Sequence, residues 1–180
     1  MRPTLALLLL GLTTPVAAQS QHKPPAPATK PAPAAAAGPK ELGKFDDWIA
    51  ATHQEGGQNV CYAFVRARNS VPALPGRGDV ILTVTQRPAG RDAVAISAGF
   101  TYRKDAAVTV QVETTGLDFY TAQGNAFARD GRAAVAAFQR GDQALARSPG
   151  ARDGQVVADT FSLKGFSAAY AAINKACPAR

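Results

Sequence analysis

The chain has 180 residues, of which 46% are hydrophobic and 18% charged, and its formal net charge is +7 at pH 7. The sequence contains no basic helix and no block of like charge, which argues against nucleic-acid binding. It also has only two cysteines and two histidines, so we expect neither a metal site nor a cofactor.

Residues 1–18 have the form of a secretory signal peptide. Arg2 supplies the positive charge, residues 5–12 form a short apolar run, and Val16-Ala17-Ala18 offers small residues before a cleavage point. That run is too short for a permanent membrane helix, although a retained anchor is the alternative. We expect a mature chain without a transmembrane segment, in the periplasm, associated with the outer membrane, or secreted.

Residues 19–43 are dominated by the run KPPAPATKPAPAAAAGPK at 23–40, which is built almost entirely of proline, alanine and lysine. That run offers no large apolar side chain whose burial could offset the entropy of ordering it, so residues 19–43 are predicted to be a disordered, extended tether. A single domain should then occupy residues 44–180, with a formal charge of only +4.

Most of this domain predicts β-strands. The clearest is residues 107–113, where valines alternate with polar residues. Further candidates, separated by turns rich in proline and glycine, are residues 60–66, 79–86, 93–98, 117–121, 125–129, 143–147 and 155–161. Short strands with frequent turns favour an antiparallel β-sandwich or a partly open barrel, a mainly β fold.

Two helices are expected on this sheet. Asp130 can cap a helix over residues 131–140, and Gly141 can end it in the left-handed conformation. The second helix covers about residues 165–177, where Phe166, Tyr170 and Ile173 recur at helical spacing. This stripe predicts packing on the sheet, although a ligand groove lined by Phe166 and Tyr170 is the alternative.

Cys61 and Cys177 predict a disulfide, because an even number of cysteines in an exported chain usually pairs. The bridge would tie the end of the last helix to the first predicted strand. Two buried thiols or a redox role remain alternatives, but the sequence has no C-x-x-C motif.

Residues that could form a catalytic site are sparse. The domain has one histidine, His53, which we place in a polar loop over residues 52–59, and its aspartates are scattered. No G-x-S-x-G, Walker or dinucleotide-binding motif occurs. The sequence therefore predicts a protein that is not an enzyme, and no catalytic residue is nominated.

Three segments resemble the invasion associated locus B family, exported proteins of α-proteobacteria. They are Phe45-Asp46-Asp47-Trp48, Val60-Cys61-Tyr62, and the run from Asp159 to Cys177 that contains Ser162-Leu163-Lys164-Gly165-Phe166. Asp46 stands where the family usually has glycine. The resemblance implies a periplasmic or outer-membrane location and an association with entry into host cells. It carries over no catalytic residue.

The leading hypothesis is a non-enzymatic binding protein of the cell envelope, linked to host-cell invasion or to envelope integrity. Its partner would be an envelope protein or a cell-wall component. Candidate surface contacts are Phe100, Tyr102, Arg103 and Lys104, because aromatic residues and arginine dominate binding hot spots. Trp48 is a further candidate, or a core residue. The alternatives are an envelope hydrolase and a structural or stress-protective envelope protein.

Overall fold

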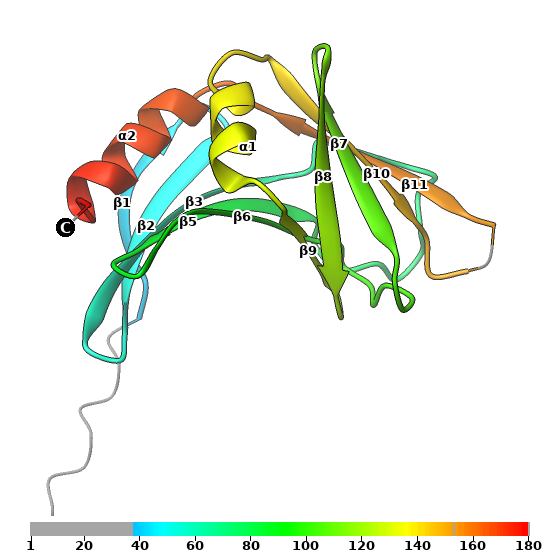
Figure 1. The fold of residues 1–180 in the computed structure, drawn as a ribbon, viewed down its shortest axis with the longest axis horizontal. Coiled ribbons are helices and arrows are strands. Elements are labelled where there is room, and N and C mark those ends of the chain that lie inside the picture. Colours follow the sequence, from blue (N-terminus) through cyan, green and yellow to red (C-terminus); the bar gives the residue numbers. More distant parts are fainter. Residues whose placement is uncertain (1–37, 153, 180) are drawn as a thin grey trace, which may run out of the picture. The chain divides into compact units, whose positions relative to one another are not determined.

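The computed structural model describes residues 38–152 and 154–179, so the expected signal peptide and most of the expected tether lie outside the described residues. Within them, eleven strands form one sheet in the order β1-β2-β3-β5-β6-β9-β8-β7-β10-β11-β4 (Figure 1). The strands are β1 (Lys40–Phe45), β2 (Trp48–Glu55), β3 (Gln58–Arg66), β4 (Asn69–Val71), β5 (Ile81–Arg87), β6 (Gly90–Ser97), β7 (Ala107–Val112), β8 (Thr115–Ala122), β9 (Asn125–Ala128), β10 (Gln143–Pro149) and β11 (Val156–Ser162). The helices are α1 (Gly131–Phe138) and α2 (Phe166–Ala176).

The sheet is open and every strand pair in it is antiparallel. Its last strand, β4, follows β3 after two residues and pairs with β11. The Arg68 backbone N–H also donates to the Thr160 carbonyl at 2.8 Å. The sheet therefore curls until β11 approaches the chain that leaves β3, and the prediction of a mainly β, partly open antiparallel architecture with two helices is confirmed.

Both helices pack on the same side of the sheet, which we call its inner face. α2 contacts β1, β2, β3 and β5, while α1 contacts β6 and β8. Phe166, Ala169 and Ile173 of α2 are buried in one core cluster with inward-facing strand residues such as Ala63 and Leu82. The expected packing of the C-terminal helix on the sheet is confirmed.

The start of α1 follows the prediction and its end does not. The Asp130 side chain accepts a hydrogen bond from the Ala133 N–H at 2.9 Å, as expected of a cap. The helix, however, ends at Phe138, and the residue after it, Gln139, keeps a right-handed conformation. The prediction of a left-handed Gly141 is wrong, since its φ is not positive. Glycine is needed there for space, because a Cβ would lie 2.3 Å from Val112 Cγ1.

The N-terminal edge of the sheet corrects two predictions. β1 begins at Lys40, so residues 40–43 belong to the sheet and not to the tether. His53 lies within β2, and only the tight turn at Gly56 and Gly57 separates β2 from β3, so the loop predicted over residues 52–59 is wrong. Polar residues are tolerated at the tip of this hairpin because an antiparallel sheet can leave such residues facing water.

In the part of the chain that the structure describes, neither helix is long and apolar enough to cross a membrane.

Candidate functional site

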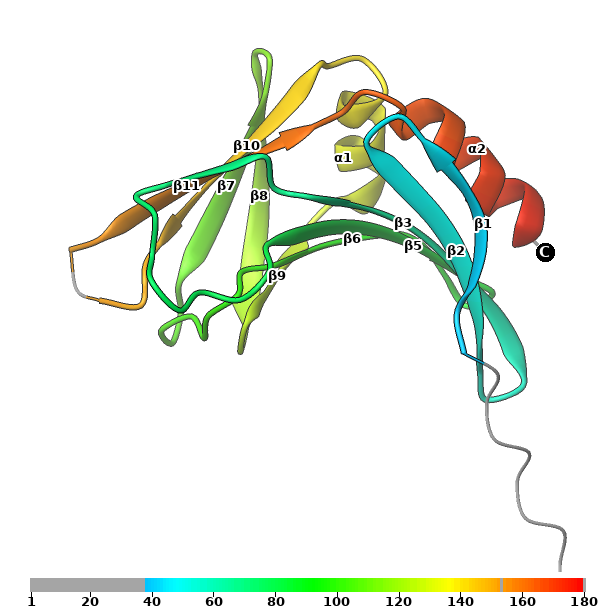
Figure 2. The ribbon, with the colours of Figure 1, turned by 180° about the vertical axis from the view of Figure 1, so that it is seen from behind.

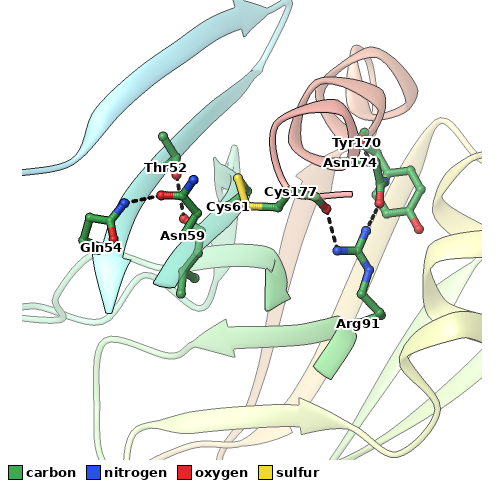
Figure 3. The surroundings of a disulfide bond; sticks show 9 residues. Thr52, Gln54, Asn59, Cys61, Arg91, Tyr170, Asn174 and Cys177 are labelled. Atoms are coloured by element: carbon green, nitrogen blue, oxygen red, sulfur yellow. Dashed lines mark hydrogen bonds between the residues drawn. A yellow bond between two sulfur atoms is a disulfide. The ribbon is translucent and has the colours of Figure 1, made fainter. Parts of the chain in front are cut away.

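The predicted disulfide between Cys61 and Cys177 is present and joins β3 to the end of α2 (Figure 3). The same helix end is held by Arg91, whose Nη1 donates to the Cys177 carbonyl at 2.6 Å and whose Nη2 donates to Asn174 Oδ1. Cys177 is 6% exposed and Cys61 is fully buried. The cysteines therefore have a structural role at the junction of helix and sheet.

Residues 162–166, which we call the closing motif, lead from β11 into α2 and contact the β1–β2 turn. Trp48 is fully buried, its Nε1 donates to the Ser162 carbonyl at 3.0 Å, and its ring lies 4.8 Å from that of Phe166. Trp48 is thus a core residue, the second of the two interpretations offered for it. Leu163 is buried as well, whereas Lys164 is exposed and pairs with Asp46 at 3.5 Å.

The closing motif requires glycine at position 165. The φ of Gly165 is +89°, and an added Cβ would lie 2.0 Å from the Phe45 carbonyl oxygen. Nearby, a hydrogen bond from Ser162 and the Arg68 guanidinium hold the pKa of the Asp47 carboxyl below its usual value. The closing motif therefore builds a packed corner of the fold, and its side chains do not converge on an open cavity.

The four candidate surface contacts differ in how far they are exposed to solvent. Arg103 and Lys104 are exposed, and Phe100 is half-buried. Tyr102 is only 7% exposed, so the expectation that it forms a surface contact is wrong. Its backbone N–H donates to the Gln123 carbonyl at 2.8 Å, which fixes the segment and turns the ring inward. Burial raises the pKa of Tyr102.

Next to this segment, Arg77 and Asp159 form a buried ion pair. Arg77 Nη1 and Nη2 donate to the two Asp159 oxygens at 2.7 and 2.8 Å, and Arg77 Nε donates to the Ala98 carbonyl at 2.6 Å. The guanidinium lies 5.0 Å from the centre of the Phe100 ring. A small cavity of about 200 Å³ adjoins it. All three guanidinium nitrogens of Arg77 donate a hydrogen bond, so the pair locks the β4–β5 connection to β11.

His53 is not brought together with the aspartates. Its Nε2 lies 3.8 Å from Glu55, which also accepts from Arg87 Nε at 2.9 Å, and its ring meets the edge of Tyr62. The Arg87 hydrogen bond lowers the pKa of Glu55. Among residues 38–152 and 154–179, no group of three or more histidine, cysteine, aspartate or glutamate side chains could hold a metal ion.

The outer face of the sheet, opposite the helices, carries a feature that the sequence interpretation missed. Neither described helix lies on this side of β3, β5 and β6 (Figure 2). Two pairs of stacked rings stand there: Tyr62 with Phe64 on β3, centroids 6.0 Å apart, and Tyr120 with Phe127 on β8 and β9, centroids 5.5 Å apart. Tyr120 is 45% exposed and the other three rings are half-buried.

Small residues separate the two pairs. Phe64 pairs with Thr83, Thr83 with Ala95, and Ala95 with Phe127 in consecutive register. In the next row, Tyr62 pairs with Thr85 and Thr85 with Ala93. Directly paired residues point to the same face, so these side chains form one surface. We call it the aromatic face, and it consists of Tyr62, Phe64, Thr83, Thr85, Ala93, Ala95, Tyr120 and Phe127.

One sequence signal could have located half of this face. In the segment Val60–Arg66, Cys61, Ala63 and Val65 alternate with Tyr62 and Phe64, and the alternation assigns the two rings to the face opposite the cysteine. The other half depends on the pairing of β6 with β9, which joins strands far apart in sequence and leaves no local pattern.

Comparison with known proteins agrees with this architecture. The family model for the invasion associated locus B (IalB) protein matches residues 48–174. A solved structure, that of invasion associated protein B from Bartonella henselae, is similar with a TM-score of 0.56 and 18% sequence identity, covering 74% of this chain and 95% of the other. At that identity, the likeness shows a shared fold. A search of curated proteins found no match.

Proposed function

We propose that this chain, which belongs to the invasion associated locus B family, is an exported binding protein of the bacterial cell envelope. Its place would be the periplasm, with outer-membrane association or secretion as further destinations of an exported chain. The expected signal peptide supports the export step. The name of the structural neighbour links that protein to invasion, and a role in host-cell entry or in envelope integrity is the corresponding proposal for this one.

The observation that carries the binding proposal is the aromatic face. Aromatic rings left partly exposed on a face of the sheet that neither described helix covers are available to a partner, and aromatic residues supply much of the energy of binding surfaces. The exposed Arg103 and Lys104, with the edge of Phe100, lie on the 98–106 connection and are a second contact candidate. The partner would be an envelope protein or a cell-wall component.

No specific observation favours the two alternatives. An envelope hydrolase would need an acid–base set, yet the carboxylate beside His53, Glu55, is held by Arg87 on the surface. No feature of the described residues distinguishes a purely structural role from a binding role. We therefore assign no catalytic step to this chain.

Site-specific photo-crosslinking in living cells tests the proposal. A diazirine-bearing phenylalanine at position 120, which keeps an aromatic ring on the aromatic face, should give a discrete adduct in the envelope fraction. The same amino acid at position 171 is the matched control, because Ala171 is exposed on α2, on the helical side of the sheet. No adduct, or an identical adduct pattern at both positions, would contradict binding through this face.

A further inference from the structure

The chemistry of the aromatic face favours one class of ligand. The four rings form two walls, and the residues between them on β5 and β6 are alanine or threonine. Phe64 and Phe127 are separated by three strand spacings, about 14 Å at ~4.8 Å per strand. A ligand that contacts both walls must therefore be extended, and it must present flat apolar surfaces at its two ends.

The centre of the face is polar and uncrowded. Thr83 and Thr85 each bring a hydroxyl to the surface between the walls, where both are half-buried. A hydroxyl both donates and accepts hydrogen bonds. Ala93 is exposed and Ala95 half-buried beside them, so the neighbouring side chains leave room for a ligand to reach these hydroxyls.

Two arginines at the ends of the face are engaged in ion pairs. Arg87 pairs with Glu55 at 2.9 Å at one end of the strands, and Arg66 pairs with Asp79 at the other. The Arg129 guanidinium lies 5.7 Å from the centre of the Tyr120 ring, where it extends that wall as a planar donor. Paired charges of both signs suit a neutral partner, whereas a strongly anionic one would be matched by a cluster of uncompensated cations.

These features match an oligosaccharide. The C–H groups on one side of a pyranose ring form a flat apolar surface that packs on an aromatic face, while its hydroxyls take up the hydrogen bonds of threonine and arginine. We propose that the aromatic face binds a neutral glycan chain that runs across β5 and β6 between the two ring pairs. This rests on the proposed envelope-binding function and specifies its ligand class.

Calorimetric titration of the mature chain tests the glycan. The probes are hexamers of N-acetylglucosamine, β-1,4-linked glucose and α-1,4-linked glucose, with a hexamer of galacturonic acid as the anionic comparison. We expect at least one neutral hexamer to bind, and to bind at least tenfold more tightly than the uronate. If no neutral hexamer binds, or if the uronate binds as well as the best of them, the inference is wrong.

Two substitutions at exposed positions place the binding on this face without disturbing the core. Tyr120→Ala removes the more exposed ring of one wall and Ala93→Arg fills the space between the walls, and each should weaken binding of the neutral hexamer at least tenfold. Tyr120→Phe keeps the ring and should retain binding, and Ala171→Arg on α2 is the matched control for an added arginine. Undiminished binding by Tyr120→Ala and Ala93→Arg, in variants with an unchanged melting temperature, would overturn the assignment.

The crosslinking experiment separates this inference from the function on which it rests. Periodate oxidises sugars, and protease digests a protein partner. An adduct from position 120 whose added mass is lost on periodate oxidation but is retained after protease digestion supports the glycan. An adduct that is a protein without glycan would sustain envelope binding and overturn the glycan inference. No adduct together with no hexamer binding would contradict both.

Discussion

Arg77 and Asp159 form a two-bond ion pair whose side chains are only 5% and 3% exposed, and the pair joins the connection before β5 to the middle of β11. Ser70 of β4 donates to the same carboxylate at 2.7 Å. Three segments that meet where the sheet curls toward its end are thereby held by a single carboxylate. A buried charge of this kind is costly when its partner is removed.

Removing one partner of this pair should be strongly destabilising. Arg77→Met leaves the Asp159 carboxylate buried beside Ser70 alone, and we expect a loss of about 3–5 kcal/mol in the free energy of unfolding. The matched control is Arg66→Met, since the Arg66 and Asp79 side chains are 60% and 65% exposed and such pairs contribute about 0–1 kcal/mol. Urea denaturation of both variants measures the difference; equal losses would contradict the structural role of the pair.

Substitutions at Gly165 and Gly57 separate the energetic cost of backbone strain from that of a steric clash. Both have positive φ, +89° and +77°, but only Gly165 has a backbone oxygen in the place of a Cβ. Gly57→Ala should cost about 1 kcal/mol for its conformation, and Gly165→Ala about 3 kcal/mol because α2 must also move away from Phe45. Thermal denaturation distinguishes the two, and a similar melting temperature for both variants would show that α2 is not seated as described.

The stability of the domain should fall at alkaline pH. Burial raises the pKa of Tyr102, and burial together with the hydrogen bond to Asp92 raises that of Tyr170, in both instances above the ordinary value of 10.0. The folded state therefore favours the neutral phenols. Their contribution is complete below pH 10.0, where unfolded tyrosine begins to ionise, and is lost as the pH rises toward the folded pKa values. Denaturation at pH 8 to 11 should show this decline, and Tyr102→Phe should reduce it; an unchanged decline would exclude Tyr102 as a cause.

The disulfide should stabilise both the domain and the end of α2. Its two cysteines are 116 residues apart, and replacing both with alanine should cost about 2–5 kcal/mol. Arg91→Met keeps the disulfide but loses the donors to Cys177 and Asn174, so a smaller cost of about 1–3 kcal/mol is expected. Hydrogen exchange along Phe166–Ala176 reports the fraying of the helix. Equal protection in the native protein and in the double alanine variant would contradict this account.

The sequence predicted those parts of the fold that have a local pattern. The alternating valines of β7, the cap at Asp130 and the apolar stripe of α2 each appear where they were expected. The strands β1 and β2 were missed, because Lys40–Phe45 has no alternation and the polar residues around His53 are typical of a loop. They become strands through pairing, of β1 with β2 and of β2 with β3.

The candidate site was less predictable than the fold. Tyr102 looked like a surface residue because it lies beside Arg103 and Lys104, but the Gln123 carbonyl fixes its backbone and its ring is buried. The aromatic face depends on β3, β5, β6 and β9 lying side by side in register. That order follows from the curl of the whole sheet, which no single segment encodes.

The most direct test of an exported, disulfide-closed domain is the mass of the protein recovered from the periplasmic fraction. Free thiols are alkylated under denaturing conditions before and after reduction. We predict a monomer that begins near Gln19, takes up no alkylating reagent before reduction, and takes up reagent at both Cys61 and Cys177 afterwards. A chain that keeps residues 1–18, stays in the cytoplasm and is alkylated at both cysteines without reduction would contradict the account.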